Sequence, residues 1–552
     1  MADRLTIALA QLGQSVGDLP GNADRMLAAR AKTVADLIVF PEMELVGYPA
    51  EDLVLKPALA RRSAEQVARL VAASADGGPA MLVGTIERIE GSSQVHNVIL
   101  LIADGRIAGR TIKHELPNYG TFDEKRVFAP GPLPEPIEFR GVKIGVPICE
   151  DIWFPKVCAH LRERGAELLI APHGSPYEID KDDLRVCGVA AKRVAETGLP
   201  LALINRVGGQ DELVFDGASF VLNADGSVAH QLPDWEEHLR ETVWERGPAG
   251  WRCVPGEIAR LDDHPADTYH AMLVGLRDYV NANRFPGVVL GLSGGIDSAL
   301  SAAVAVDALG PERVWCVMMP SKYTADISES DAAECARLLG CRLDTIAIEP
   351  AMTAFDAMLA SVFAGRAPDL AEENIQSRIR GLTLMAVSNK FGPMLLTTGN
   401  KSEMSVGYAT IYGDMAGGYS VLKDAYKTTV FALSRWRNAN RPRWSLGPDG
   451  PVMPERVITR PPSAELRDDQ KDEDSLPPYD ILDPILMGLV EEELSVGEIV
   501  ERGFDRETVA RIERLLYVAE YKRRQAPPGV KLGKRNFGRD RRYPITNAFR
   551  TL

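Results

Sequence analysis

Hydrophobic residues in the first part of the chain recur in short runs in which apolar and polar positions partly alternate. A period of two is typical of β-strands, whose successive side chains face opposite sides of a sheet. Apolar positions at helical spacing predict helices over residues 21–35, 57–75 and 181–197. Strands make up much of this half, and we predict them over residues 5–12, 36–41, 81–88, 95–103, 142–149, 167–171, 200–205 and 217–223.

The pattern changes after residue 268, where strands and helices alternate regularly. A helix begins near Tyr269. This βαβ order is typical of a doubly wound parallel sheet with helices on both faces. We therefore predict an α/β fold, and the successive elements are strand 288–293, helix 298–309, strand 314–319, helix 328–339 and strand 343–348.

Between these two patterns, residues 245–268 carry proline, glycine and acidic residues in place of periodic apolar positions. Such composition is typical of a linker. A chain of 552 residues also exceeds what one hydrophobic core usually supports. We therefore expect two domains, at residues 1–250 and 269–552, joined by a linker at 251–268.

Composition and charge exclude several classes of function. No apolar run approaches the roughly 18 residues that cross a bilayer, and the N-terminus lacks a signal-peptide cleavage region. We therefore expect a cytoplasmic protein without membrane partners. A net charge of −14 opposes nucleic-acid binding. The basic stretch 522–542 is either a solvated surface or a segment that closes over an anionic small molecule.

The most informative chemistry lies in a glycine-rich loop between the strand at 288–293 and the next helix. Gly294 and Gly295 allow the backbone to approach a ligand, and amides that open a helix point at an anion. Ser293 and Ser298 add hydroxyl donors. Asp297 would repel phosphate unless a cation such as Mg²⁺ bridged them, which favours a metal–nucleotide ligand. The simpler alternative is an ordinary strand-to-helix turn with glycines for geometry.

This loop matches neither common nucleotide-binding motif, but it resembles the S-G-G-x-D-S loop of the N-type ATP pyrophosphatases. That family activates a carboxylate or carbonyl group with ATP and releases pyrophosphate. The resemblance implies a fold like that of adenine nucleotide α-hydrolases. It also implies that ATP is bound by Gly291, Leu292, Ser293, Gly294, Gly295, Ile296, Asp297 and Ser298.

Three reactive residues stand at or after predicted strands in the first half. They are Glu42 in V-F-P-E, Lys113 before L-P-N-Y, and Cys149 in G-V-P-I-C-E-D-I-W. Each alone has an ordinary structural explanation. Together and in this order they resemble the Glu-Lys-Cys set of the nitrilase (carbon–nitrogen hydrolase) superfamily, which implies an α-β-β-α sandwich.

The chemistry explains why these residue types belong together. A thiolate attacks an amide carbonyl far better than a thiol does, so Cys149 needs a base. Glu42 would take the proton and return it to the leaving ammonia. Lys113, with the backbone amide of Glu150, would stabilise the tetrahedral oxyanion. Glu44 is the alternative base, and we expect the other six of the seven cysteines to serve in packing.

Within the superfamily, the segments Gly47–Leu53 and Phe122–Arg126 resemble the glutaminase domain of NAD synthetases. Glutamine is then the implied nitrogen donor. By the same resemblance its binding residues are Tyr119, Phe122, Glu150, Ser175 and Lys181.

The second half carries further segments that resemble NAD synthetases. Glu403 and Asp297 together suggest a clamp for a divalent cation. Residues 412–419 are predicted to form a mobile lid, and residues 461–479 a second ordered loop. Lys423 and Lys427 are alternatives for a phosphate contact, with Lys427 preferred. The resemblance implies ATP contacts at Lys322, Thr398, Lys427 and Ser463, and deamido-NAD contacts at Asn374, Glu403 and Lys522.

The resemblance to glutamine-dependent NAD synthetases covers nearly the full chain in motif order. It implies that ATP, with Mg²⁺, activates the nicotinate carboxylate of deamido-NAD, and that ammonia from L-glutamine then gives NAD, AMP, pyrophosphate and glutamate. It also implies a passage for ammonia and a homo-oligomer. The alternatives are a different acceptor, as in asparagine-, guanylate- or tRNA-modifying relatives, and a non-catalytic regulatory protein.

Overall fold

The computed structural model describes residues 3–463, 465–467, 474 and 476–549. The chain divides into two compact units, Met1–Asp262 and Asp263–Leu552.

Two mixed sheets form the centre of the first unit. The seven-stranded sheet has the order β15-β14-β1-β2-β3-β4-β5 and the six-stranded sheet the order β13-β12-β9-β8-β7-β6. The first comprises β1 (Arg4–Gln11), β2 (Leu37–Val39), β3 (Ala80–Arg88), β4 (Val95–Ala103), β5 (Arg106–Ile112), β14 (His238–Gly247) and β15 (Gly250–Cys253). The second comprises β6 (Ile137–Phe139), β7 (Val142–Gly145), β8 (Leu168–Pro172), β9 (Leu201–Ile204), β12 (Phe220–Leu222) and β13 (Val228–Gln231). A separate hairpin joins β10 (Val207–Gln210) to β11 (Leu213–Asp216).

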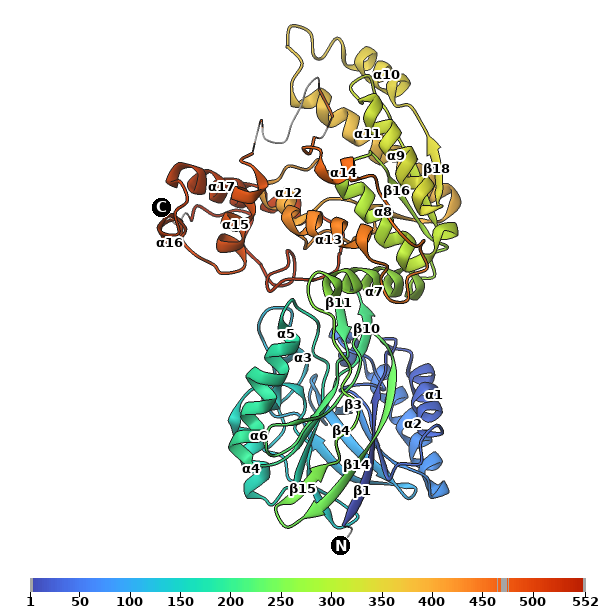
Figure 1. Cartoon of the computed structure of the whole chain (residues 1–552), viewed down its shortest axis with the longest axis vertical. Coiled ribbons are helices and arrows are strands. Elements are labelled where there is room, and N and C mark those ends of the chain that lie inside the picture. The colour runs from blue at the N-terminus through green and yellow to red at the C-terminus, as the bar shows by residue number, and fades with distance from the viewer. Residues whose placement is uncertain (1–2, 464, 468–473, 475, 550–552) are drawn as a thin grey trace. The chain divides into compact units, whose positions relative to one another are not determined.

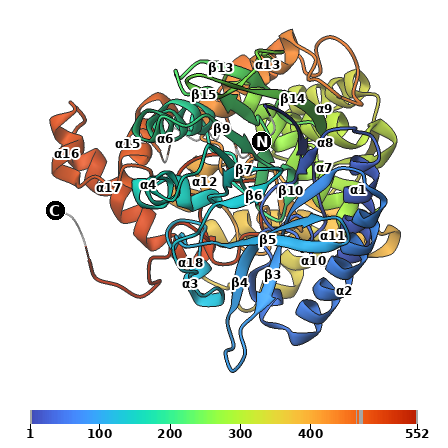
Figure 2. The same ribbon diagram turned by 90° about the horizontal axis from the view of Figure 1, so that it is seen from below.

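One hydrophobic core joins the inner faces of the two sheets, with Ile7 and Leu9 from one sheet and Leu168 and Ile170 from the other. Figures 1 and 2 show one pair of helices outside each sheet. This arrangement confirms the predicted α-β-β-α sandwich. The pairs are α1 (Leu19–Arg30) with α2 (Pro57–Ala73), and α4 (Pro155–Glu163) with α6 (Ala191–Thr197).

The helix expected over 181–197 consists of three consecutive parts. A short α5 (Lys181–Asp183) leads into a π-helical segment, Leu184–Ala190, before α6 begins. A further short helix is α3 (Glu124–Val127). A π-helical turn is uncommon in proteins, and where it occurs it is often at a functional site.

The predicted linker differs from the structure at its N-terminal end. Gly250–Cys253 forms β15, which pairs with β14 in the seven-stranded sheet. Trp251 and Cys253 are buried there while Arg252 is exposed. A four-residue strand with this alternation is too short to stand out beside the prolines and glycines that surround it, which explains why the composition suggested a linker.

The second unit is built on a parallel five-stranded sheet of order β18-β17-β16-β19-β20. Its strands are β16 (Val288–Gly291), β17 (Val314–Met318), β18 (Arg342–Thr345), β19 (Met394–Thr397) and β20 (Tyr419–Ser420). Its helices include α7 (Ala266–Ala282), α8 (Ile296–Leu309), α9 (Asp326–Leu339), α10 (Glu349–Leu359), α11 (Leu370–Phe391) and α13 (Lys427–Ala439). The parallel βαβ order confirms the doubly wound fold.

The remaining helices of this unit form a core of their own. Leu482, Ile485, Ile512 and Leu516 are buried in that core, together with Met404. Figure 1 shows α15, α16 and α17 gathered together. The helices are α12 (Lys401–Val406), α14 (Glu455–Thr459), α15 (Tyr479–Val490), α16 (Val496–Glu501), α17 (Arg506–Val518) and α18 (Glu520–Arg523). No helix within the described residues is long and apolar enough to span a bilayer.

Candidate active sites

The three reactive residues of the first unit meet at the ends of strands from both sheets. Glu42 follows β2, Lys113 follows β5, and Cys149 follows β7. Glu42 and Lys113 are 0% exposed and Cys149 is 4% exposed. Lys113 Nζ lies 2.7 Å from Glu42 Oε1. The structure therefore brings together residues that are far apart in the sequence.

The two oxygens of Glu42 have different surroundings. Oε1 accepts hydrogen bonds from Lys113 Nζ and from Asn97 Nδ2, both at 2.7 Å. Oε2 is buried and has no hydrogen-bond partner among the described residues. Burial raises the pKa of Glu42, but the charge and hydrogen bonds of Lys113 and Asn97 outweigh it, so this pKa lies below its ordinary value. Glu42 is therefore ionised, with one oxygen free to accept a proton.

The pKa of Cys149 is shifted in the opposite direction to that of Glu42. Burial, and then the negative charge of Glu42, raise the pKa of its thiol well above the ordinary value, while Lys113 and the backbone amide of Gly174 act in the opposite direction. The resting group is a thiol. A nucleophilic Cys149 thus requires a base beside it, and Glu42 meets that requirement.

Glu124 is a second buried carboxyl at Lys113. Lys113 Nζ lies 3.0 Å from Glu124 Oε1, which also accepts a hydrogen bond from the Tyr48 hydroxyl at 2.9 Å. Burial raises the pKa of Glu124 to about 7, against the attraction of Lys113. The sequence drew attention to Glu124 only as part of the F-D-E-K-R segment, because its distance of 82 residues from Glu42 gives no local signal of contact.

Asp151 fixes the turn that carries the nucleophile. Cys149 has a φ of 46°, in the left-handed region that is strained for residues other than glycine. Two residues later, the buried Asp151 carboxylate accepts hydrogen bonds from the amides of Ile148 at 2.9 Å, Glu115 at 2.8 Å and His114 at 3.1 Å. It therefore ties the segment after Lys113 to the cysteine turn.

The residues expected to bind glutamine form a chain of contacts beside this cluster. The Tyr119 hydroxyl donates to Glu150 Oε1 at 3.0 Å, and the rings of Tyr119 and Phe122 lie 5.6 Å apart. Lys181 Nζ lies 5.9 Å from the centre of the Phe122 ring. Ser175 is buried next to Gly174, whose amide reaches the Cys149 thiol. Glu150 and Ser175 thus adjoin the reactive cluster, and Tyr119, Phe122 and Lys181 continue outward from Glu150, with an anion at Glu150 and a cation at Lys181.

The second unit contains a cavity of about 280 Å³ at the carboxyl ends of β16, β17 and β19. Gly294 is outside its described lining, but it has a φ of 80°, and a Cβ there would lie 2.2 Å from the Ser328 carbonyl oxygen. Glycine is therefore required at this position. The expected residues that line the cavity are Gly291, Leu292, Ser293, Gly295, Ile296, Asp297, Ser298, Thr398, Glu403, Lys427 and Ser463.

Helix α8 begins inside the glycine loop, two residues earlier than predicted. Ser298 Oγ accepts a hydrogen bond from the Ser293 amide at 3.2 Å and donates one to the Gly295 carbonyl at 2.9 Å. Asp297 and Ser298 therefore lie in the first turn, where backbone amides have no partner within the helix. The loop thus presents an anion-binding helix start to the cavity.

Asp297 and Glu403 share one cation in this cavity. Lys427 Nζ lies 2.5 Å from Asp297 Oδ2 and 3.2 Å from Glu403 Oε1. Asn400 Nδ2 donates to Asp297 Oδ1 at 2.8 Å. Lys427 is therefore the lysine at these carboxylates, while Lys423 lines a smaller neighbouring cavity together with Glu403.

These carboxylates fit a Mg²⁺ site only in part. Within the described residues, no group of three His, Cys, Asp or Glu side chains could hold a metal. Mg²⁺ is usually bound by one or two carboxylates together with substrate phosphates and water. The pair Asp297 and Glu403 matches this pattern provided that a nucleotide supplies the remaining oxygens.

Besides Gly294, three expected residues lie outside the described lining of the cavity. Lys322 is exposed, with Nζ 5.0 Å from the centre of the Tyr323 ring. Asn374 Oδ1 accepts a hydrogen bond from Thr410 Oγ1 at 2.9 Å. Lys522 Nζ donates to the carbonyl oxygens of Gly407 at 2.8 Å and Ala409 at 2.7 Å. Asn374 and Lys522 therefore meet the same segment, residues 407–410, which directly follows α12.

Much of the basic stretch 522–542 is engaged within the protein. Arg523 donates to the carbonyl of Ser405 at 2.8 Å, and Arg541 lies 2.7 Å from Glu520. Lys531 lies 3.1 Å from Asp540. These groups hold the C-terminal segment in place, so they differ from the solvated surface that composition alone allows.

Comparison with known proteins gives the same picture over the whole chain. A family model for NAD synthase matches residues 268–526, and one for carbon-nitrogen hydrolase matches residues 6–242. A glutamine-dependent NAD(+) synthetase of Rhodobacter capsulatus is 54% identical, with all of both chains covered. The chain belongs to the glutamine-dependent NAD(+) synthetases.

Other members of the glutamine-dependent NAD(+) synthetases agree with this assignment. One from Xanthomonas campestris pv. campestris is 47% identical, with 99% of this chain and 98% of the relative covered. Among solved structures, an Acinetobacter baumannii member in complex with adenosine diphosphate is 42% identical, with a TM-score of 0.78 and 98% of both chains covered.

Several cavity residues of the second unit had no clear signal in the sequence. Arg380, Arg460, Asp414 and Glu465 line the cavity alongside the expected residues. Arg380 Nε donates to the Met319 carbonyl at 3.1 Å. Asp414 belongs to the predicted lid at 412–419. Much of the predicted loop at 461–479 lies outside the described residues.

The cysteines also differ in part from the expectation of simple packing. Cys187 is exposed. Cys316 on β17 and Cys341 before β18 have their sulfur atoms 3.7 Å apart. Neighbouring parallel strands brought these two together, which their spacing in the sequence could not indicate.

Proposed function

We propose that this chain catalyses the ATP- and glutamine-dependent amidation of deamido-NAD to NAD, with AMP, pyrophosphate and glutamate as the other products. The observation that carries the proposal is the presence in one chain of two differently built sites. One holds a buried cysteine beside the Glu42–Lys113 ion pair, and the other an anion-binding glycine loop beside Asp297 and Lys427. Full-length similarity to glutamine-dependent NAD(+) synthetases supports it.

In the first unit, the Cys149 thiol transfers its proton to the free Oε2 of Glu42, and the thiolate attacks the carboxamide carbon of glutamine. Lys113 and the Glu150 amide stabilise the resulting oxyanion. Glu42 returns the proton to the departing amine, so ammonia leaves and a thioester remains on Cys149. Glu42 then activates water, which hydrolyses the thioester to glutamate and restores the thiol.

The charges beside Cys149 are complementary to the α-ammonium and α-carboxylate groups of glutamine. Glu150 supplies an anion for the α-ammonium group and Lys181 a cation for the α-carboxylate. Tyr119 and Ser175 provide hydroxyl groups, and Phe122 an apolar wall. We assign these five residues to glutamine binding because a zwitterion requires this separation of charge.

In the second unit, the loop amides and Lys427 hold the triphosphate of ATP, while Thr398 and Ser463 contact the nucleotide. Asp297 and Glu403 would hold Mg²⁺, which supplies charge neutralisation on the phosphates when it is bound. The nicotinate carboxylate of deamido-NAD attacks the α-phosphorus and pyrophosphate leaves. Ammonia produced at Cys149 then attacks the acyl-adenylate, which releases AMP and forms the amide.

We propose that Asn374, Glu403 and Lys522 contact deamido-NAD. Asn374 and Lys522 both hold residues 407–410, directly after the helix that carries Glu403. A dinucleotide that met this segment would therefore reach all three. Lys322, whose side chain is exposed, stays a proposed ATP contact.

The test is a complete reaction with purified full-length protein, ATP, Mg²⁺, deamido-NAD and glutamine. We expect NAD, AMP, pyrophosphate and glutamate in equal amounts, each quantified by chromatography. Omission of deamido-NAD should abolish AMP formation. If the mixture yields no NAD, or if AMP forms equally well with aspartate or xanthosine monophosphate as acceptor, the proposal is wrong.

A further inference from the structure

Residues 173–175, which follow β8, form one wall of the cysteine site. The Glu42 amide donates to the His173 carbonyl at 3.3 Å, and the Gly174 amide is hydrogen-bonded to the Cys149 thiol. A Cβ on Gly174 would lie 3.1 Å from Glu42 Oε2 and 3.0 Å from Tyr48 Cδ1. A side chain at this position would press on Glu42 and Tyr48, so the backbone wall runs close to the proposed base and to the cysteine.

Asn205, which follows β9, is hydrogen-bonded to the backbone of this wall. Asn205 Oδ1 accepts a hydrogen bond from the Ser175 amide at 3.0 Å, and Asn205 Nδ2 donates one to the Ser175 carbonyl at 3.0 Å. Asn205 is 0% exposed. A planar carboxamide that engages both backbone groups of one residue fixes its orientation as well as its place.

A buried ion pair determines which way the Asn205 carboxamide faces. Asp216 Oδ1 accepts from Asn205 Nδ2 at 3.3 Å and from Arg185 Nη1 at 2.8 Å. A carboxylate only accepts hydrogen bonds, so the amide nitrogen must face it. Arg185 Nη1 also lies 3.5 Å from the Ser175 carbonyl. Arg185 lies in the π-helical segment Leu184–Ala190, directly after the short helix α5 that begins at Lys181. The network therefore links the backbone of Ser175 to the helical segment that follows Lys181.

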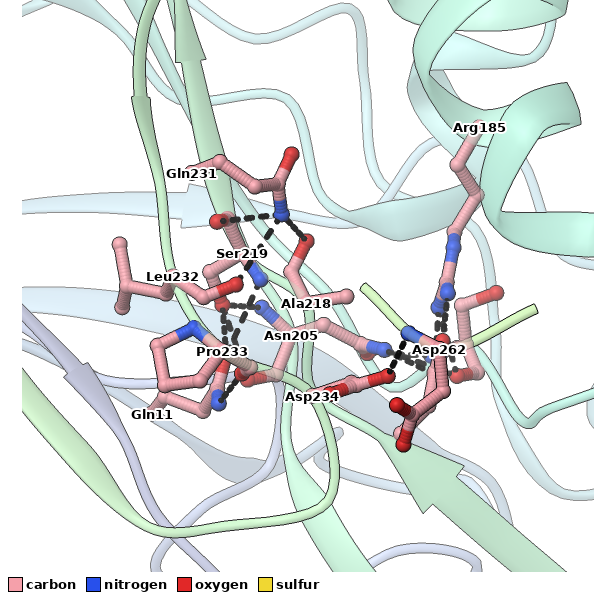
Figure 3. A network of polar contacts seen from close by, with 12 residues as sticks. Gln11, Arg185, Asn205, Ala218, Ser219, Gln231, Leu232, Pro233, Asp234 and Asp262 are labelled. Carbon is pink, nitrogen blue, oxygen red and sulfur yellow. Dashed lines mark hydrogen bonds and ion pairs between the residues drawn. The ribbon is translucent and has the colours of Figure 1, made fainter. Parts of the chain in front are cut away.

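The network continues to the opposite sheet. The Asn205 amide donates to Ser219 Oγ at 3.0 Å, and Ser219 Oγ donates to Gln11 Oε1 at 2.8 Å. Gln11 Nε2 in turn donates to the Pro233 carbonyl at 2.7 Å. Figure 3 shows these contacts converging on Asn205, with Arg185 approaching from the helical side. Asn205 is thus anchored at both its backbone and its side chain.

We propose that Asn205 is a positioning residue of the glutaminase reaction: through the backbone of Ser175 it sets the place of the wall that meets glutamine and Cys149. This role rests on the glutaminase function proposed above. Asn205 acts through Ser175 and Gly174 and takes no proton itself. Its removal should therefore weaken glutamine use without affecting synthesis from ammonia.

The chain offers a matched control in Asn223. Asn223 Nδ2 donates to the Cys253 carbonyl at 3.1 Å, and Asn223 Oδ1 accepts from the Cys253 amide at 2.8 Å. Asn223 is 1% exposed. It thus makes the same pair of backbone hydrogen bonds in the same unit, but to the edge strand β15. The variants Asn205→Ala and Asn223→Ala each remove two side-chain hydrogen bonds to the backbone of one residue, and Asn205→Ala also removes the 3.3 Å contact with Asp216.

The experiment compares both variants in the full-length protein for glutamine-driven and ammonia-driven NAD synthesis. We expect Asn205→Ala to raise the KM for glutamine about tenfold, the factor expected for about one lost hydrogen bond. Asn223→Ala should change it less than twofold at a similar loss of thermal stability. Ammonia-driven synthesis should stay within twofold of the parent in both. Equal KM values in the two variants would overturn the proposal.

A double variant tests whether Asn205 acts through Ser175. Because Asn205 holds the Ser175 backbone, the part of its effect that reaches glutamine through the Ser175 hydroxyl is already lost in Ser175→Ala, so adding Asn205→Ala should raise KM by less than the about tenfold expected in the parent. Effects that multiply fully would show independent roles and contradict the proposal. Glutamate release by the unaltered protein tests the proposed glutaminase function separately, because it involves no change at Asn205.

Discussion

The two candidate sites differ in how their charged side chains are buried and paired. In the first unit, Glu42, Lys113 and Glu124 are paired with one another and are at most 4% exposed. In the second, the side chains of Asp297 and Glu403 are each 18% exposed and share Lys427 at the edge of a cavity of about 280 Å³. One site is complete without its substrate, whereas the other has room and charge for a large anionic ligand.

The difference follows from the charge that each substrate carries. A carboxamide is neutral at its reacting atoms, so the protein must supply base, oxyanion donor and nucleophile, and hold them where water cannot separate them. A nucleoside triphosphate carries its own charge. Buried counter-charges without that ligand would be costly, so the second site offers helix amides and a partly exposed ion pair instead.

The strongest test of this separation is Cys149→Ala. Loss of the nucleophile should reduce glutamine-driven NAD synthesis at least about 10⁴-fold, while ammonia-driven synthesis stays within about twofold. Both rates are measured by NAD formation in the full reaction. Cys187→Ala, which alters an exposed cysteine, is the control and should match the parent. Equal loss with both nitrogen sources would show that the two sites are not separable.

Asp297→Asn tests the second site in the same way. Removal of a carboxylate at the phosphates should lower synthesis about 10³-fold with glutamine and with ammonia alike. Alkylation of Cys149 by iodoacetamide, followed by mass spectrometry, should proceed at the parent's rate. Asp326→Asn changes an exposed aspartate at the start of α9 and serves as the control. A variant that retained ammonia-driven synthesis would rule out the proposed role of Asp297.

Glu42→Gln and Glu44→Gln distinguish the two candidate bases. Glu42 has the free oxygen at the cluster, so its substitution should lower the glutamine-driven kcat about 10²- to 10⁴-fold. Glu44→Gln makes the same chemical change two residues later and should lower it less than about threefold. Steady-state kinetics with glutamine measure both. The reverse order would identify Glu44 as the base.

Glu44 also gives the buried unit a pH-dependent stability. Burial raises the pKa of Glu44 to about 8, so the folded protein keeps a proton that the unfolded chain loses near its ordinary pKa. The free energy of unfolding should therefore fall as pH rises from about 4.5 to 8. Glutamine cannot ionise, so the Glu44→Gln variant lacks this fall in the free energy of unfolding. The free energy of unfolding of the variant minus that of the parent should therefore increase by about 2 to 4 kcal/mol between pH 5 and pH 8.

Denaturant unfolding followed by tryptophan fluorescence measures this difference. Glu90→Gln alters an exposed glutamate of the same unit and should show no such trend. A difference between parent and Glu44→Gln that stays constant with pH would mean that Glu44 is ionised in the folded protein.

The smallest expected effect is a change in the KM for ATP on substitution of Lys322. Because its side chain is exposed and outside the described lining of the cavity, Lys322→Ala should raise the KM for ATP less than about threefold. Lys427→Ala, which removes the cation between Asp297 and Glu403, should raise it more than about tenfold. Initial rates at varied ATP give both values. A large effect at Lys322 would mean that this segment moves into the site when ATP binds.

The sequence predicted most of the architecture because the relevant signals are local. The βαβ order from residue 288 and the sandwich of the first half were confirmed, as was the family. The four-residue strand β15 was missed, because its two buried positions are indistinguishable from those of a loop rich in proline and glycine. The longer strands β5 and β14 were not predicted either.

By itself, the sequence identified the glycine loop, Glu42, Lys113 and Cys149, because each is part of a short motif with its own chemistry. Only the tertiary structure decided which oxygen of Glu42 is free, that Lys427 and not Lys423 joins Asp297 to Glu403, and that Glu124 and Asn205 support the cysteine site. Those facts depend on contacts between residues tens to hundreds of positions apart. Such contacts are set by how the sheets and helices pack, and no local pattern of residues records them.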